Sequence, residues 1–271
     1  MANFRGASSD AVALLSRELD GTVGEDTEAA ARVGQGLFDI AGVLRAEPSL
    51  RRVATDVSVA GPAKANLVRG IFDGKVDERP LGLLAQAVQQ RWTATRDLAD
   101  ALEHLGVVAT VRSAGGDSDR LADELFTLGQ LVNDNPGLRD AVSDPARSGA
   151  DKRALVRGLL EDKALPATIA LAEQALSGSY RTVGVALHEY QQVAAEVNDQ
   201  RVATVRVARP LADDERRRLA GALSEQYGRD VHLNVVVEPG VVGGMRVEIG
   251  HDVIDGTVSA RLDEARRRLA G

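Results

Sequence analysis

Residues 37–71 read LFDIAGVLRAEPSLRRVATDVSVAGPAKANLVRGI, and residues 125–159 read LFTLGQLVNDNPGLRDAVSDPARSGADKRALVRGL. At a constant offset of 88 residues, 12 of these 35 positions are identical, and no gap is needed. Identities at the same offset continue further along the chain, for example at Gln86 and Gln174. So many matches at one fixed period indicate an internal duplication.

Each copy has the pattern of short helices. Apolar residues recur at helical spacing in residues 37–44 and, in the same phase, in residues 125–132. Pro48 and Pro136 are placed to start the next helix, where a missing N–H costs no hydrogen bond. A period of 88 residues is short for a bundle of about five or six helices with their loops. We therefore expect residues 93–111 to serve both copies, as the last helix of one and the first of the other.

From residue 200 onward the pattern changes from helical spacing to alternation. Residues 202–208, 231–237 and 245–249 alternate apolar and polar side chains, as strands with one buried face do. Residues 211–227 combine an acidic first turn with an apolar stripe, which predicts a helix, and residues 257–270 carry a second apolar face.

The expected fold is therefore mostly α with a small α+β part. A duplicated N-terminal helical bundle precedes a C-terminal β-α-β-β-α domain. The expected domains are an extra helical copy at residues 1–92, a second helical bundle at 93–199 and the α+β domain at 200–271.

Composition narrows the classes of function. The 271 residues carry 33 Lys and Arg against 40 Asp and Glu, a net charge of -7, which argues against a protein that works by neutralising phosphates. There is no cysteine, so disulfides and thiolate metal sites are excluded. No stretch approaches the ~18 consecutive apolar residues of a membrane-spanning helix. We expect a soluble, cytoplasmic protein with no direct membrane insertion.

The motifs of common catalytic sites are missing from the sequence. It contains no phosphate-binding G-x-x-x-x-G-K-[ST] loop and no G-x-S-x-G nucleophile elbow. Its four histidines form no pair at metal-ligand spacing. Gly243 and Gly244 lie between two expected strands, which favours a hairpin turn over a phosphate cradle. The sequence therefore predicts a binding or structural protein without cofactor, metal or catalytic residues.

Two triple-arginine runs, at residues 216–218 and 266–268, raise a nucleic-acid hypothesis. Each follows acidic residues by three or four positions, a spacing that makes local ion pairs on a helix. A solvated helix face is the favoured interpretation, followed by a protein-docking face and then by nucleic acid.

Residues 231–271, VHLNVVVEPGVVGGMRVEIGHDVIDGTVSARLDEARRRLAG, carry a family resemblance. They resemble the signature of the delta subunit of F-type ATP synthases, which is similar to the mitochondrial oligomycin-sensitivity-conferring protein. A weaker match extends back to about residue 90. The matching positions are Glu238, Val241, Gly243, Gly244, Met245, Val247, Gly250, Ile254, Asp255, Gly256, Thr257, Arg261 and Leu262.

The resemblance implies a noncatalytic role in the peripheral stalk, at the cytoplasmic face of the cell membrane. In this family the helical bundle grips N-terminal helices of α subunits on the catalytic head, which also contains the β subunits, and the C-terminal domain holds the b-type stalk subunit. An apolar groove between helices suits such a partner helix. Its expected lining in the second copy is Leu125, Phe126, Leu155, Val156 and Leu159.

The first 90 residues depart from the usual family member. They look like the extra copy of a long, actinobacterial form. Two other functions stay open on the sequence alone. One is a stand-alone helical adaptor for amphipathic peptides, and the other is a nucleic-acid binder that uses residues 200–271.

Overall fold

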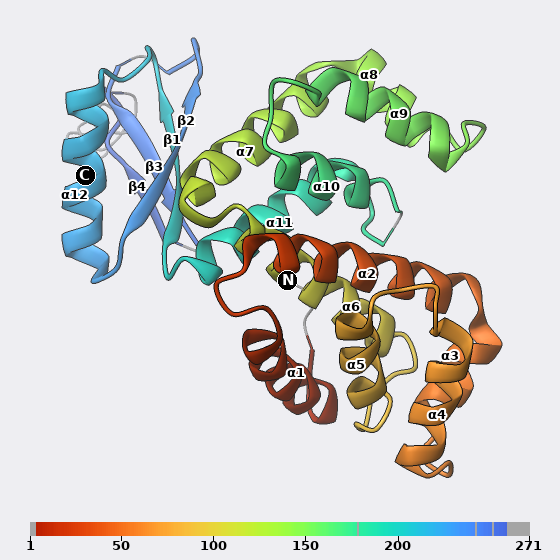
Figure 1. Cartoon of the computed structure of the whole chain (residues 1–271). Helices are drawn as coiled ribbons and strands as arrows, with labels where there is room; N and C mark the ends of the chain where they lie inside the picture. The colour runs from red at the N-terminus through yellow and green to blue at the C-terminus, as the bar shows by residue number, and fades with distance from the viewer. Residues whose placement is uncertain (1–3, 178, 242, 251, 259–271) are drawn as a thin grey trace, which may run out of the picture. The chain divides into compact units, whose positions relative to one another are not determined.

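A computed structural model describes residues 4–177, 179–241, 243–250 and 252–258. The chain divides into two compact units, Met1–Ala194 and Ala195–Gly271. The first unit is built from helices (Figure 1), and the last of them, α11, runs across the boundary between the units. Its helices are α1 (Ala7–Val23), α2 (Thr27–Ala46), α3 (Pro48–Thr55), α4 (Gly61–Phe72), α5 (Glu78–Ala87), α6 (Asp97–Ser113), α7 (Ser118–Asp134), α8 (Pro136–Ser143), α9 (Gly149–Leu160), α10 (Pro166–Ala175) and α11 (Val183–Val197).

The duplication is visible in the helix boundaries. Helices α3, α4 and α5 begin and end 88 residues before α8, α9 and α10, and α2 ends 88 residues before α7. The same hydrogen bond recurs at equivalent positions. The Arg51 guanidinium donates to the carbonyl oxygen of Arg45 at 3.3 Å, and the Arg139 guanidinium donates to that of Asn133 at 3.0 Å. These arginines satisfy carbonyls at the end of the preceding helix, where no intrahelical donor remains.

Helix α6 occupies the place of the expected shared helix. Shifted by 88 residues in one direction it overlaps α1, and shifted in the other it overlaps α11. Its buried residues Leu98, Leu102 and Leu105 belong to the core formed with α1, α2, α4 and α5. The division of the helical part into 1–92 and 93–199 stays a prediction, since residues up to Ala194 form one compact unit.

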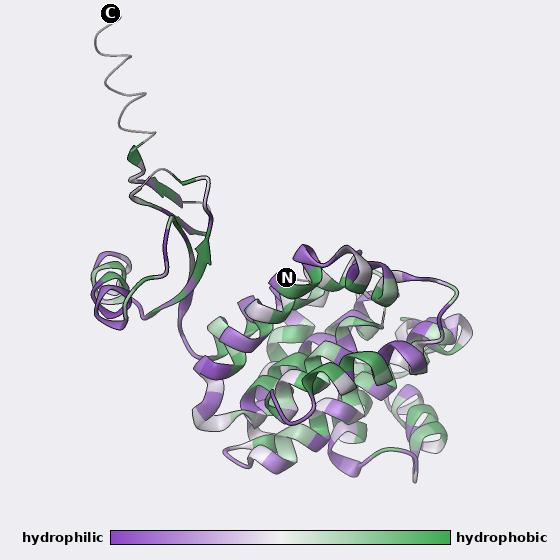
Figure 2. Ribbon diagram, turned by 90° about the horizontal axis from the view of Figure 1, so that it is seen from above, coloured by the Kyte–Doolittle hydropathy of each residue, from purple (hydrophilic) through white to green (hydrophobic). Residues whose placement is uncertain are grey.

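Helices α2 and α6 lie side by side at a pair of glycines. A Cβ atom at Gly34 would lie 2.5 Å from the Thr110 hydroxyl oxygen, and one at Gly106 would lie 2.6 Å from the ring of Phe38. The missing side chains allow the two backbones to approach closely. Figure 2 shows green and purple residues alternating along the helices, as expected where one side of each helix is buried.

The turn after α9 contains a strained residue that the first copy avoids. Asp162 has a φ of 60°, and the equivalent position in the first copy is Gly74, with a φ of 68°. A side chain in this left-handed conformation crowds the following carbonyl, which glycine does not.

We therefore expect Asp162→Gly to raise the free energy of unfolding by about 0.5–1 kcal/mol. The reciprocal change, Gly74→Asp, should lower it by a similar amount. Both values follow from urea unfolding of the full chain. No change in either variant, or a fall for Asp162→Gly and a rise for Gly74→Asp, would show that the turn conformation does not control stability here.

The C-terminal unit contains a four-stranded sheet with one helix against it. Its elements are β1 (Arg201–Val207), α12 (Asp213–Tyr227), β2 (Val231–Val237), β3 (Met245–Ile249) and β4 (Asp252–Asp255). The strand order is β2-β1-β3-β4, with β1 parallel to β2 and the other pairs antiparallel. Leu219, Leu223 and Tyr227 of α12 pack on alternate residues of β1, β2 and β3. The expected class, mostly α with a small α+β part, is confirmed.

Two expectations about this unit need correction. Gly243 and Gly244 do not form a hairpin turn, because β3 pairs with β1 rather than with β2 among the described strands. The connection instead crosses the end of β1, where the Glu238 N–H donates to the Val207 carbonyl at 2.8 Å. Strand β4 was not expected, and it forms the actual hairpin with β3. Most of the expected helix at 257–270 lies outside the described residues.

Candidate functional site

The residues expected to line a groove in the second copy differ in exposure. Leu125 on α7 and Val156 on α9 are 1% and 5% exposed, so they belong to the core. Phe126 and Leu155 are half-buried, and Leu159 is 38% exposed. Some of the apolar positions that the two copies share are thus core positions. Of the five predicted residues, Phe126, Leu155 and Leu159 remain as candidates for contact with a partner.

Leu131 on α7 is an accessible apolar residue that the sequence analysis missed. It is 42% exposed, and its equivalent in the first copy, Val43 on α2, is 39% exposed. Leu67 on α4 is similarly open, at 40%. The repeat could have pointed to these residues, because positions 88 residues apart, such as Val43 and Leu131, both carry an apolar side chain. Both copies therefore expose apolar side chains on corresponding helices.

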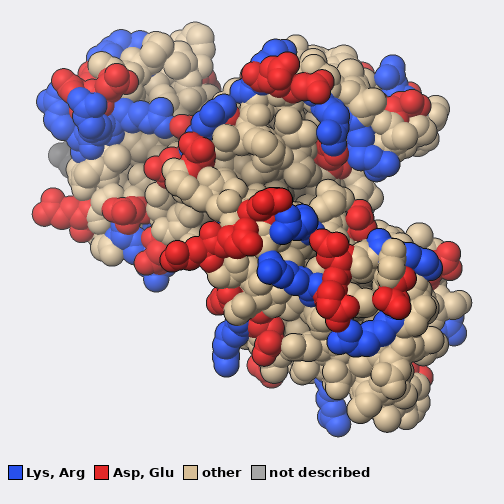
Figure 3. All heavy atoms as spheres, viewed as in Figure 1, with Lys and Arg blue, Asp and Glu red and all other residues tan. Residues whose placement is uncertain are grey.

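A cleft of about 980 Å³ lies within the helical unit, between α2 on one side and α9 and α10 on the other. From α2 it is lined by Phe38, Gly42 and Val43, among others. On the opposite side the Arg157 guanidinium lies 2.7 Å from a carboxylate oxygen of Glu173. Figure 3 shows acidic and basic side chains interspersed over the visible face of the molecule. The cleft is thus lined by apolar, polar and charged side chains together.

The signature glycines of the C-terminal unit are required by backbone geometry. Gly243 and Gly244 have φ values of 77° and 79°, and a Cβ at Gly244 would lie 2.4 Å from the Gly256 carbonyl oxygen. The backbone there is paired, because the Gly256 N–H donates to the Met245 carbonyl at 2.9 Å and the Val258 N–H donates to that of Gly243 at 3.2 Å. This pairing leaves no room for a side chain at Gly244.

Four other signature residues gather around one pocket of about 450 Å³ on the sheet, namely Glu238, Val241, Asp255 and Thr257. The connection that crosses the end of β1 places Glu238 and Val241 beside Asp255 and Thr257. Glu238 lies 3.3 Å from the Arg206 guanidinium. The side chain of Asp255 accepts hydrogen bonds from the Thr257 hydroxyl at 2.7 Å and from its N–H at 3.0 Å, and these hold the pKa of Asp255 below its usual range.

The remaining signature residues have different positions. Val247 is buried, Met245 packs on the edge of the same core, and Gly250 adopts a positive φ of 58° after β3. Ile254 is 39% exposed on β4. Arg261 and Leu262 lie outside the described residues. Much of the signature thus maintains the sheet and its connections.

The first arginine run is engaged in local contacts. Arg217 forms an ion pair with Asp214, Arg218 donates to the Asp214 carbonyl at 3.2 Å, and Arg216 donates to that of Leu233 at 3.0 Å. Arg217 and Arg218 are exposed and agree with the interpretation as a solvated helix face, whereas Arg216 is half-buried and ties α12 to β2. The second run, at residues 266–268, lies outside the described residues.

Among the described residues, no three or more His, Asp or Glu side chains lie together as a metal ion would require. No helix of that part of the chain has the length and hydropathy needed to span a bilayer.

Comparisons with known proteins give a consistent result. A family model described as the ATP synthase delta (OSCP) subunit matches residues 105–269. An ATP synthase subunit delta of Nocardioides sp. is 57% identical over 100% of this chain and 98% of its own length. The protein of the same name from Kineococcus radiotolerans is 42% identical over 98% of each chain.

Among solved structures, a chain of the Toxoplasma gondii mitochondrial ATP synthase hexamer is 20% identical, with a TM-score of 0.35. It covers 61% of this chain and 95% of its own length. The family model begins within α6, whereas the bacterial relatives align from end to end. The first copy is thus shared with relatives of the same length.

Proposed function

Because this chain belongs to the ATP synthase delta (OSCP) family, we propose that it is the noncatalytic stator subunit that links the catalytic head to the proton-translocating sector. In that place it resists the torque of the rotating shaft, so that proton flow drives ATP synthesis. The end-to-end identity of 57% to a delta subunit carries this proposal. As part of that complex, the chain would act at the cytoplasmic face of the cell membrane.

The two units suit two different partners. We assign the N-terminal helices of α subunits to the helical unit, where Phe126, Leu131 and Leu159 offer partly accessible apolar side chains on α7 and α9. A partner helix with apolar residues at i, i+3, i+4 and i+7 fits such a surface. We assign the b-type stalk subunit to the C-terminal unit. These assignments extend the family's pattern to this chain.

The rival functions have weaker support. A nucleic-acid binder needs basic side chains free to meet phosphates, whereas the described arginines of α12 are engaged with carboxylates and carbonyls. A stand-alone peptide adaptor would use the same apolar surface as a stator subunit. The partners recovered from the cell separate these two.

Co-purification tests the proposal directly. The tagged full chain is isolated from its own cell membranes after solubilisation in a mild detergent, and the α, β and b subunits should be recovered with it. Recovery of peptides without these subunits supports the adaptor, and binding that falls steeply with salt in the presence of DNA supports the nucleic-acid binder.

Variants locate the surface that binds the head. The double change Leu131→Asp and Leu159→Asp should reduce recovery of α and β more than about tenfold, because a buried apolar anchor contributes about 2 kcal/mol or more. Recovery of b should be unchanged. The control is Val57→Asp in the first copy, where the side chain is 76% exposed. Equal losses from both variants would contradict the assignment to α7 and α9.

A further inference from the structure

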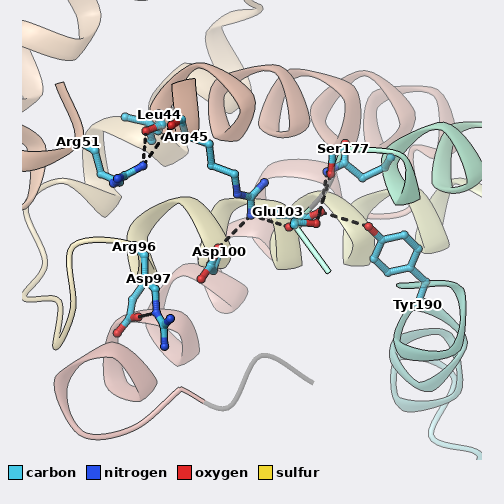
Figure 4. Close-up of polar contacts among 11 residues, drawn as sticks. Leu44, Arg45, Arg51, Arg96, Asp97, Asp100, Glu103, Ser177 and Tyr190 are labelled. Carbon is cyan, nitrogen blue, oxygen red and sulfur yellow. Dashed lines mark hydrogen bonds and ion pairs between the residues drawn. The ribbon is translucent and has the colours of Figure 1, made fainter. Parts of the chain in front are cut away.

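A buried carboxylate lies where the two helical copies meet. Glu103 of α6 is 4% exposed. Its Oε2 accepts a hydrogen bond from Nη2 of Arg45, on α2, at 2.6 Å, and the same nitrogen lies 3.0 Å from Asp100 (Figure 4). Burial lowers the pKa of Arg45, but the charges of Glu103 and Asp100 outweigh that effect and raise it above its ordinary value. Arg45 therefore stays charged and ties the first copy to α6.

The other oxygen of the same carboxylate is held by the second copy. Oε1 accepts from the Gln174 amide at 2.6 Å, the Ser179 hydroxyl at 2.6 Å and the Tyr190 hydroxyl at 3.1 Å. Tyr190 is fully buried on α11 and faces Glu103 in Figure 4. Burial and the adjacent carboxylate raise the pKa of Tyr190, so its hydroxyl remains a donor. One side chain thus accepts hydrogen bonds from both copies.

Two members of this cluster, Glu103 and Tyr190, are absent from the repeated pattern, whereas Gln174 has its equivalent in Gln86. The positions 88 residues before and after Glu103 are Leu15 and Gln191, so neither carries a carboxylate. The position equivalent to Tyr190 is Leu102, which is fully buried. A buried charge is costly unless it is fully paired, and an apolar residue would otherwise suit such a site. The carboxylate therefore belongs to the junction rather than to the architecture of a single copy.

The cleft beside the cluster leaves this junction open on one side. Arg45 and Gln174, which both bind Glu103, line the cleft between α2 and the pair α9 and α10. Side chains do not fill the space between α2 and the helices α9 and α10. Apart from the few residues at which α2 and α10 approach each other, the angle between the copies is held by α6 and by the groups bound to it.

We propose that Glu103 is a clasp that fixes the angle between the first helical copy and the second. Arg45 pulls α2 onto the carboxylate from one side, while Gln174, Ser179 and Tyr190 hold α10, the loop after it and α11 from the other. Without the clasp, α2 can move relative to α9 and α10, and the cleft changes width. The inference concerns the chain alone and does not depend on the proposed function.

Distance measurements on the full chain test the clasp. The sequence has no cysteine, so Val53→Cys on α3 and Leu159→Cys on α9 give two unique positions for spin labels, at residues 41% and 38% exposed. Double electron–electron resonance should give one narrow distribution of distances between the two spin labels. Glu103→Leu and Glu103→Gln should each make it about twofold wider, since the junction then has more than one arrangement.

The matched control is Glu124→Gln. Glu124 accepts hydrogen bonds from the Leu165 N–H at 2.8 Å and the Thr168 hydroxyl at 2.6 Å, all within the second copy. This variant should unfold at a lower temperature with an unchanged distribution. If Glu103→Gln is helical by circular dichroism and its distribution stays narrow, the clasp is wrong. Equal broadening in Glu124→Gln would also overturn it, since the effect would then be general loosening.

Discussion

Gly244→Val is expected to unfold the C-terminal unit while the helical unit stays folded. The new Cβ would lie 2.4 Å from the Gly256 carbonyl oxygen and 2.9 Å from the Thr257 Cα, both of which are backbone atoms that cannot rotate away. The φ of 79° adds strain for any side chain. Together these effects should cost about 3–5 kcal/mol, a large part of the stability of a small unit.

Hydrogen exchange resolves this effect by segment. In Gly244→Val, amides of β1 and β3 should exchange at least about tenfold faster, while those of α1 to α10 keep their rates. The matched control is Gly240→Val in the same connection, where an added Cβ meets nothing within 4 Å and φ is not positive. Protection of the sheet in Gly244→Val equal to that in Gly240→Val would refute the packing argument.

Removal of residues 1–92 is expected to leave a protein that self-associates. Leu98, Leu102 and Leu105 of α6 are fully buried in the core formed with the first copy, so truncation exposes them. Each buried leucine contributes about 1.5–3 kcal/mol when removed from water, and an exposed apolar stripe of this kind promotes association. The truncated chain should elute from a sizing column as oligomers and unfold at a lower temperature.

The control for truncation is removal of the other unit. A chain that ends at Ala194 keeps the whole compact helical unit and should remain monomeric with cooperative unfolding. If the chain without residues 1–92 is equally monomeric and cooperative, then α6 does not need the first copy. The two copies would in that case be separate domains in the sense first expected.

The repeat made the helical part predictable. The helix starts at Pro48 and Pro136 follow from local chemistry. The offset of 88 residues makes α4 and α5 the sequence equivalents of α9 and α10. Three strands could also be placed, because alternation is a local pattern, whereas β4, which is exposed along its length, was missed. Their order could not. Alternation indicates which side of a strand is buried, but not which strand lies beside it, so β3 was assigned to the wrong neighbour.

The candidate site was less predictable than the fold for a related reason. Apolar periodicity does not distinguish a side chain that packs in the core from one that awaits a partner. Leu125 and Leu131 both lie on α7, yet one is buried and the other is open. Glu103 carries no local signal of its burial, because its partners lie on segments 58 to 87 residues away. Neither distinction is encoded in local sequence.

ATP synthesis driven by a proton gradient tests the central claim, that this chain holds the head against the shaft. Inverted membrane vesicles from cells that lack the chain, supplied with the purified head, should hydrolyse ATP but synthesise almost no ATP under a gradient. Addition of the purified full chain should restore synthesis, and the Gly244→Val variant should not. Equal rates of synthesis with and without the chain would contradict the stator function.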